Sequence, residues 1–170
     1  MDDWQFARVP AFRADAQALP HPERLLYDSE TDPFTIGGIA QGLFAQYGYD
    51  VRHPLSHIRL FTHDFSHHAL VVLHNQSEHD AELLVFASPG VRWTLTTARG
   101  LARWMFLQQG LQRVTLRLRA SDATARDYAL RLGFRHEGII RAAFKDGEDC
   151  SLWGMLRREC RLLKGAHSGH

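Results

Sequence analysis

Histidine is the residue type with metal-binding or acid–base chemistry that stands out most in this sequence. The chain of 170 residues carries 11 histidines, and five of them fall together with Asp64 between positions 63 and 79. Histidine is a common zinc ligand, and His63 and His67 would share one face of a helix. The segment has the pattern of strands and turns, however, without a fixed ligand motif. We therefore expect turn and surface histidines and no metal site.

A second candidate for chemistry is a carboxylate at the start of an apolar run. Glu82 directly precedes the apolar residues 83–87 and would stand at the beginning of a central strand, where it could accept a proton, directly or through water. The alternative is a solvated residue at the edge of the strand. Asp80 and His79 are weaker candidates for the same role. Cys150 has no histidine nearby in the sequence and is expected to be a buried thiol.

Short strands and helices alternate along the chain and would position these groups. Polar turns separate three apolar runs, which predicts an antiparallel meander. An apolar stripe of helical period then ends at Gly110, and a later helix would begin at the N-cap Asp122 and end at Gly133. Residues 1–33 hold four of the six prolines and are predicted to be irregular. The predicted elements are helix 34–47, strands 58–61, 69–73 and 82–87, helix 94–109, strand 113–118, helix 123–132, and strands 138–144 and 151–156, the last two joined through Asp146-Gly147.

This order predicts a single mixed α/β domain over residues 1–170, with one sheet that is half meander and half crossover. Strand 82–87, helix 94–109 and strand 113–118 would form a parallel, right-handed βαβ unit. The two cysteines lie ten residues apart and form no CxxC pair. We expect reduced thiols and a cytoplasmic protein.

The charge and hydropathy patterns exclude two classes of partner. Lys and Arg number 20 against 19 Asp and Glu, which gives a net charge of +1 and disfavours nucleic-acid binding. Protonation of all histidines would raise that charge to +12. No apolar run reaches the length that spans a bilayer, and the first residues do not resemble a signal peptide, so we expect no membrane partner.

Four short segments in the second half of the chain follow a recognisable pattern. They read Asp122-Ala123-Thr124-Ala125, Leu132-Gly133-Phe134, Glu137-Gly138 and Arg141. Together with the order of elements, this pattern resembles the GCN5-related N-acetyltransferase (GNAT) superfamily, in which many members carry Asn-x-x-Ala/Ser, a helix, Leu-Gly-Phe, Glu-Gly and an Arg. Residues 154–160 resemble the branch that acetylates ribosomal-protein N-termini, and residues 87–93 resemble GNAT-like proteins of phages and prophages. The resemblance covers residues 58–162, with a divergent part at 1–57 and a tail at 163–170.

The resemblance implies the GNAT fold, a central mixed sheet flanked by helices, with acetyl-CoA as co-substrate. In that family the pantetheine arm bonds to strand backbone like a partial extra strand, and the pyrophosphate lies at a helix N-terminus. The implied cofactor contacts are Val85, Phe86 and Ala87 in the strand, Arg92, Trp93, Thr94, Leu95, Thr96 and Thr97 in the phosphate loop, and Asp122 and Arg126. Leu95 stands where the family usually has glycine. The segment Arg99-Gly100-Leu101-Ala102 is an alternative loop, but it leaves little room for a helix.

The implied chemistry is the transfer of an acetyl group to a primary amine of a protein N-terminus, a lysine or a small molecule. Glu82 would be the base. Tyr128 would protonate the leaving thiolate, although it lies one residue from the family position, which is Ala129 here. The alternative for Tyr128 is a partly buried aromatic residue without a catalytic role. Ala129 and Leu95 also suggest another interpretation, a non-catalytic GNAT-like binding protein that could be phage-encoded. A homodimer through the C-terminal hairpin and tail is a third interpretation.

Overall fold

The computed structural model describes residues 26–28, 41, 56–61, 68–87, 91 and 93–166. They belong to two units, one formed by Met1–Ser77 and Leu83–Arg92 and the other by Glu78–Glu82 and Trp93–His170. The predicted helix 34–47 lies outside the described residues, except for Gln41, which is helical. The prediction of a single domain stays a prediction.

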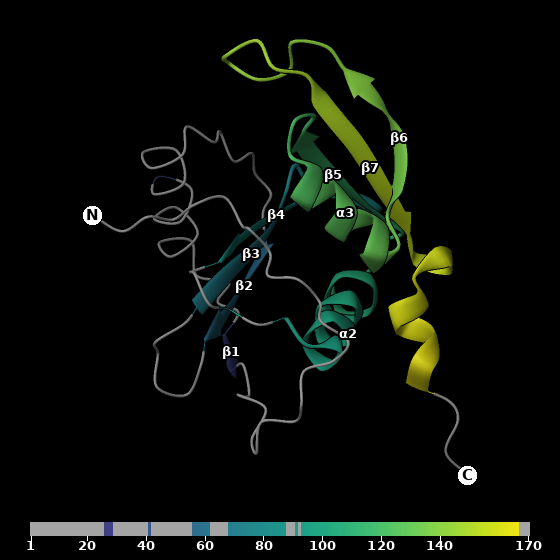
Figure 1. The fold of residues 1–170 in the computed structure, drawn as a ribbon. Helices are drawn as coiled ribbons and strands as arrows, with labels where there is room; N and C mark the ends of the chain where they lie inside the picture. Colours follow the sequence, from purple (N-terminus) through teal and green to yellow (C-terminus); the bar gives the residue numbers. More distant parts are fainter. Residues whose placement is uncertain are drawn as a thin grey trace. The chain divides into compact units, whose positions relative to one another are not determined.

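Strands make up most of the described part of the first unit. They are β1 (Leu26–Asp28), β2 (Ser56–Phe61), β3 (His68–His74) and residues 83–87 of β4 (Asp80–Ala87), which are labelled in Figure 1. β2 and β3 pair antiparallel, as predicted, and Ile58 lies opposite Val71. Val72 and Leu73 of β3 are 0% exposed and form part of the core of this unit.

β1 corrects the prediction that residues 1–33 are irregular. Its three residues pair antiparallel with residues 59–61 of β2. Proline cannot donate to a ladder, but the segment between Pro22 and Pro33 keeps all of its backbone N–H groups. The prolines therefore do not prevent a short strand between them.

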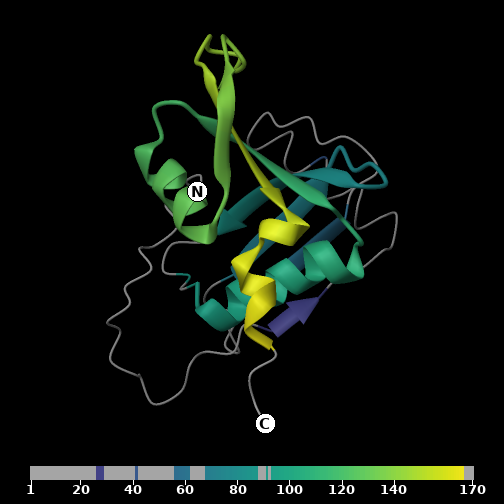
Figure 2. The ribbon, with the colours of Figure 1, turned by 90° about the vertical axis from the view of Figure 1, so that its right-hand side faces the viewer.

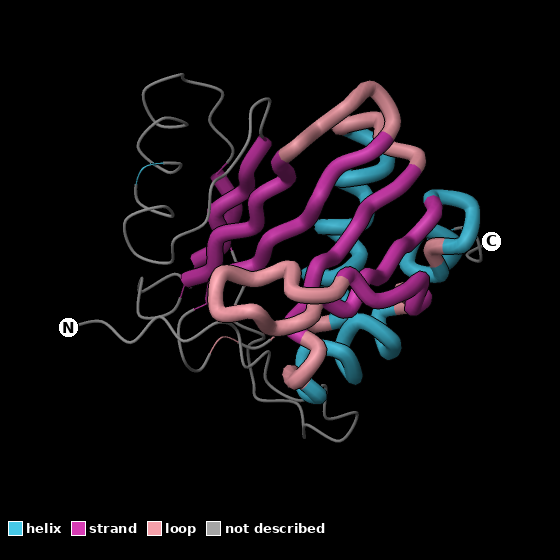
Figure 3. Tube along the Cα trace, turned by 90° about the horizontal axis from the view of Figure 1, so that it is seen from above, coloured by secondary structure: helices cyan, strands magenta, loops and turns pink. Residues whose placement is uncertain are grey.

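The second unit contains a mixed sheet with its helices. Its elements are residues 80–82 of β4, α2 (Leu95–Arg103), a π-helical turn (Trp104–Gln108), β5 (Arg113–Arg119), α3 (Ala123–Leu132), β6 (Arg135–Ile140), β7 (Cys150–Leu156) and 3-10 segments at Arg157–Glu159 and Arg161–Ala166. β4 and β5 are parallel, which confirms the predicted βαβ crossover, whereas β7 runs antiparallel to both β5 and β6. Figure 3 shows the strands in magenta and the helical segments in cyan.

β5 has one apolar and one charged face, because its residue types alternate with the period of a strand. The apolar side chains are Val114, Leu116 and Leu118, and the charged ones are Arg113, Arg117 and Arg119. Each arginine has carboxylate partners, namely Asp80 and Glu137 for Arg113, Glu82 for Arg117, and Asp146 and Glu148 for Arg119. The second face of β5 is therefore a row of ion pairs.

Glu137 of β6 and Arg113 of β5 form a bidentate ion pair across the intervening strand β7. Arg113 Nη1 donates to Glu137 Oε1 at 2.8 Å, and Nη2 donates to Oε2. Gly154 of β7 leaves room for the pair, because a Cβ there would lie 2.8 Å from Arg113 Nη2 and would overlap the Glu137 carboxylate. The hydrogen bond from Arg113 lowers the pKa of Glu137 below its ordinary value of 4.5.

This pair predicts a pH-dependent contribution to stability. A carboxyl whose pKa is lower in the folded state stabilises the fold above its unfolded pKa, and the contribution disappears as the pH falls through the folded pKa. We expect Glu137→Gln to unfold at a lower temperature than the parent protein at pH 7. The gap should shrink below about pH 4.5 and vanish in stronger acid. Thermal unfolding of both proteins from pH 3 to pH 7 measures this, and a gap that is independent of pH would contradict it.

Both helices of the second unit begin at a side-chain N-cap, and the cap of α3, Asp122, is the one that the sequence predicted. Thr94 Oγ1 accepts a hydrogen bond from the backbone N–H of Thr97 at 3.1 Å, and Asp122 Oδ1 accepts one from that of Ala125 at 2.9 Å. α3 ends at Gly133, which has a φ of +99°. The predicted helix 94–109 is confirmed to within one residue at each end, but its last five residues form a π-helical turn. Figure 2 shows the last 3-10 segment beside α2, which it contacts.

The predicted strand 138–144 is wrong at both ends, because β6 runs from Arg135 to Ile140. Ala142 has a φ of +47°, outside the strand region, and its N–H donates to Asp149 Oδ1 at 2.8 Å. The chain therefore leaves the ladder after Ile140. The Asp146-Gly147 signal was correct for a turn, since the N–H of Gly147 donates to the carbonyl of Phe144 at 2.8 Å.

Candidate functional site

Three polar atoms of the second unit are buried without a hydrogen-bond partner among the described residues. They are Nε1 of Trp93, Nε of Arg126 and the hydroxyl of Tyr128. Buried polar groups are nearly always paired, since leaving one unpaired costs about 1–3 kcal/mol. Such groups in one unit indicate positions where a ligand could supply the missing partners.

The N-terminus of α2 follows Trp93 directly. The N–H of Thr97 is bound by the Thr94 side chain and that of Ala98 by the Thr94 carbonyl. Leu95 and Thr96 carry the remaining N–H groups of the first turn, in which no acidic residue occurs. A helix N-terminus of this kind attracts anions through its backbone donors and its dipole. The Leu95 side chain is 46% exposed and stands outside the core.

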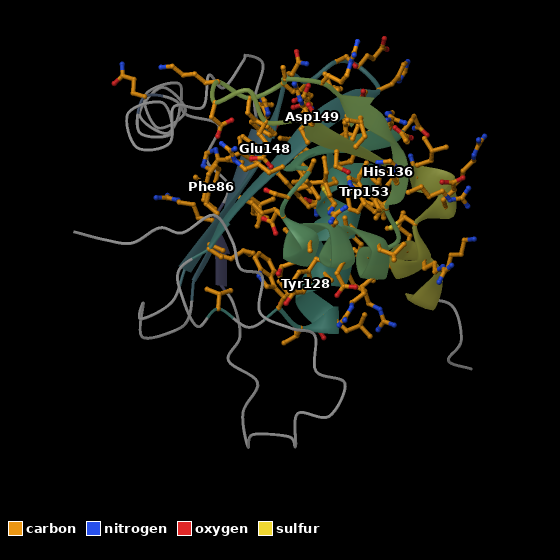
Figure 4. The ribbon with its side chains drawn as sticks, turned by 45° about the horizontal axis from the view of Figure 1, so that its top comes forward. Phe86, Tyr128, His136, Glu148, Asp149 and Trp153 are labelled. Atoms are coloured by element: carbon orange, nitrogen blue, oxygen red, sulfur yellow. The ribbon has the colours of Figure 1, made fainter. Side chains whose placement is uncertain are left out.

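Tyr128 lies in the middle of α3, and its residue is only 6% exposed. Burial raises the pKa of its phenol above 10, although the nearby charge of Arg131 acts in the opposite direction. The hydroxyl therefore keeps its proton at neutral pH and can donate it to a group that becomes basic during a reaction. Figure 4 labels Tyr128 on α3, the same helix that carries Arg126.

Glu82 lies at the point where β4 pairs with β5. Its Cα partner is Thr115, and Glu82 Oε2 is 3.9 Å from Arg117 Nη1. The Glu82 side chain is 22% exposed, so water reaches this carboxylate. It therefore has both a cationic neighbour and access to solvent.

The structure does not place all of the predicted cofactor contacts in one unit. Trp93, Thr94, Leu95, Thr96, Thr97, Asp122 and Arg126 belong to the second unit, and Val85, Phe86 and Ala87 belong to the part of β4 in the first. Phe86 and Ala87 are buried and Val85 is half-buried. Arg92 lies outside the described residues.

The connection between β6 and β7 holds residues that the sequence analysis missed. Arg119 Nη1, at the end of β5, donates to Asp146 Oδ2 at 2.7 Å and to Glu148 Oε2. The Arg119 guanidinium also lies over the Phe144 ring, 4.6 Å from its centroid. Glu148 Oε1 accepts a hydrogen bond from the backbone N–H of Ser121 at 3.0 Å. Two features of the sequence could have indicated this cluster. Arg119 ends a strand of alternating residue types, and the later turn at residues 146–149 is acidic.

Neither a metal cluster nor a membrane span is found in the part of the chain that the structure describes. Within the described ranges, no group of three or more His, Cys, Asp or Glu side chains could hold a metal ion. The positions His63, Asp64 and His67 of the histidine-rich segment lie outside those ranges. No helix among the described residues has both the length and the apolar character needed to cross a bilayer.

Comparisons with known proteins give structural neighbours and no relatives by sequence. No protein-family model matches the chain, and no curated protein matches it. The spermidine/spermine N-acetyltransferase SpeG from Vibrio cholerae in complex with manganese ions superposes with a TM-score of 0.62 at 14% identity, over 79% of this chain and 93% of that one. A dodecameric structure of the spermidine N-acetyltransferase from Vibrio cholerae gives the same TM-score and identity, over 80% and 95%. A chimera of that enzyme with hSSAT also gives 0.62 and 14%, over 79% and 97%.

These similarities establish the fold of the chain. It is a mixed α/β protein with the GNAT acyltransferase fold, as predicted.

Proposed function

We propose that this chain is an acetyltransferase that moves an acetyl group from acetyl-CoA to a primary amine. The observation that carries the proposal is the set of buried, unpartnered polar atoms on Trp93, Arg126 and Tyr128, in a chain with this fold. A ligand with an anionic diphosphate at one end and a thioester at the other would need donors of these kinds. Fold similarity alone does not establish an activity, so the proposal depends on these side chains.

The phosphates of acetyl-CoA would bind at the N-terminus of α2. The N–H groups of Leu95 and Thr96, with the hydroxyl of Thr97, are the proposed donors, and Arg92 and Arg126 would supply positive charge. Trp93 would contact the adenine or the pantetheine arm through its ring and its N–H. Asp122 would contribute through the turn at the start of α3, where its side chain already caps the helix.

The pantetheine arm would lie along strand backbone near residues 85–87 of β4. Acetyl transfer then needs a neutral amine next to the thioester carbonyl and a proton for the departing sulfur. We assign the proton donor to Tyr128, whose hydroxyl is protonated and without a partner among the described residues. We assign the base to Glu82, which would take the amine proton through water.

The role of Glu82 leads to a separate prediction. Glu82→Gln keeps the shape of the side chain but removes its basicity, so kcat should fall by about 10²-fold at neutral pH. The Kd for acetyl-CoA should stay within twofold. Glu78→Gln is a suitable control, because Glu78 is an exposed residue of the same segment. Unchanged kcat in Glu82→Gln would remove Glu82 from the mechanism and leave solvent as the proton acceptor.

A test of the overall activity is thiol release from acetyl-CoA in the presence of primary amines. Spermidine, lysine and a peptide with a free N-terminus cover the proposed acceptor classes. The peptide is included because residues 154–160 resemble the branch that acetylates ribosomal-protein N-termini. We expect amine-dependent release of free CoA with at least one of them. Binding of acetyl-CoA without turnover on any acceptor would instead favour the alternative, a non-catalytic interaction protein.

That alternative rests on Ala129, which occupies the family's tyrosine position and is 2% exposed, and on Leu95, which stands where the family usually has glycine. A phage origin is part of this alternative.

The proposal places the protein in the cytoplasm, with Cys150 and Cys160 as free thiols. The third interpretation is a homodimer through the C-terminal hairpin and tail, and it would use the hairpin of β6 and β7, where Ile139 is 52% exposed. Light scattering that shows a monomer at high concentration would exclude the dimer.

A further inference from the structure

We propose that Glu148 is a positioning residue for α3, and that it fixes the turn from which Arg126 and Tyr128 are presented. This inference rests on the proposed function, in which Arg126 binds phosphate and Tyr128 donates a proton. Glu148 lies in the connection between β6 and β7, 22 residues beyond Arg126 in the sequence. Figure 4 labels Glu148 and its neighbour Asp149 in this connection.

The contacts of Glu148 hold the turn between β5 and α3 from two sides. Its Oε1 accepts hydrogen bonds from the backbone N–H of Ser121 at 3.0 Å and from the Ser121 hydroxyl at 2.5 Å. Its Oε2 accepts a hydrogen bond from Arg119, the last residue of β5. Three donors therefore converge on this half-buried carboxylate, whose side chain is 25% exposed.

Ser121 transmits this restraint to the start of α3. Within the turn, the N–H of Asp122 donates to the carbonyl of Arg119 at 3.0 Å, and the N–H of Ala123 donates to the carbonyl of Ser121 at 2.9 Å. Asp122 is the N-cap, and its carboxylate binds the N–H of Ala125. A shift of Ser121 therefore moves the cap and the first turn of the helix with it. Because reacting groups must be placed to within a fraction of an ångström, a misplacement of about 1 Å can cost as much as 10²-fold in rate.

The connection that carries Glu148 is itself held in place. The carbonyl of Asp149 accepts a hydrogen bond from the N–H of Ala120 at 3.0 Å, and the Asp149 side chain binds the N–H of Ala142. Asp146 Oδ1 accepts a hydrogen bond from the N–H of Glu148 at 3.1 Å. These hydrogen bonds restrain the backbone from which the Glu148 side chain extends.

The opposite end of β5 provides a matched comparison. Arg113 and Glu137 also form a carboxylate–arginine pair across strands, and the Glu137 side chain is 33% exposed against 25% for Glu148. The hydrogen bonds of Glu137 go to Arg113, on a strand, and not to the start of a helix. Loss of either carboxylate should lower stability to a similar extent, but only loss of Glu148 should disturb α3.

The experiment compares Glu148→Ala, Glu148→Gln and Glu137→Ala in the full-length chain. In the unliganded proteins, hydrogen exchange measures the opening of the first turn of α3, with the N–H of Ala125 as the reporter. We expect Glu148→Ala to accelerate that exchange at least tenfold and Glu137→Ala to leave it within twofold. Glu148→Gln should restore most of the protection, because its amide oxygen still accepts from Ser121. Equal exchange in Glu148→Ala and Glu137→Ala would overturn the proposal, whether or not the protein binds acetyl-CoA.

Kinetics with acetyl-CoA supply the second readout. We expect kcat of Glu148→Ala to fall at least tenfold below that of Glu137→Ala when the two have similar unfolding temperatures. If the parent protein neither binds acetyl-CoA nor turns it over, the proposed function fails while the exchange result still decides the positioning role. If the parent protein is active and the two variants have equal kcat, the positioning role fails and the proposed function stands.

Discussion

Tyr128→Phe is expected to lower kcat for acetyl transfer about 10²-fold without lowering the stability of the protein. The substitution removes only the hydroxyl oxygen, which is buried and has no hydrogen-bond partner among the described residues. Removing an unpaired buried polar group costs the folded state nothing, so the unfolding temperature should stay the same or rise. Steady-state kinetics and thermal unfolding of the two proteins measure both effects.

Ser151→Ala is the matched control for this variant. It also deletes one oxygen from a buried side chain, since Ser151 is 1% exposed, but that oxygen accepts a hydrogen bond from Trp153 Nε1 at 2.8 Å. Loss of the acceptor leaves the indole N–H unpaired, which should cost about 1–3 kcal/mol. The two variants should therefore show opposite patterns, with activity lost in Tyr128→Phe and stability lost in Ser151→Ala. A Tyr128→Phe protein with full kcat would assign the proton donor to water or to another group.

Phe106→Ala is expected to destabilise the protein by about 3–5 kcal/mol. Phe106 lies in the π-helical turn that follows α2 and is 0% exposed, so truncation would leave a cavity in the core. At about 2–4 °C per kcal/mol, the unfolding temperature should fall by more than about 6 °C. Differential scanning calorimetry measures the shift.

Leu107→Ala is a matched control for Phe106→Ala, because the two residues are adjacent in the π-helical turn. Leu107 follows Phe106 directly but is 46% exposed, so Leu107→Ala should cost less than about 1 kcal/mol. Similar losses in Leu107→Ala and Phe106→Ala would contradict the difference in burial between these two side chains.

The sequence was most informative where a local rule fixes the structure. Asp122 and Gly133 mark the two ends of α3, because capping oxygens and positive φ angles are requirements of the helix ends themselves. The alternation along β5 and the change to a helical stripe after β4 likewise predicted the parallel crossover. These features depend on neighbours within a few residues and can be inferred without knowing the fold.

The features that the sequence did not reveal depend on contacts between distant residues. β6 ends at Ile140 because Asp149, nine residues later, binds the N–H of Ala142. The link between Glu148 and Ser121 joins residues that lie 27 positions apart. Tyr128 is out of the family register, and only the structure shows that its hydroxyl is buried and lacks a partner among the described residues. Burial and pairing of this kind result from packing, for which a single sequence gives no pattern.

Calorimetric titration of acetyl-CoA into the protein tests the central proposal most directly. We expect binding at one site per chain with a Kd below about 1 mM, the upper end of the usual range for enzyme substrates. Free CoA should compete for the same site, because the proposed phosphate contacts do not involve the acetyl group. Absence of measurable binding at millimolar acetyl-CoA would contradict the account and leave the fold without the activity proposed for it.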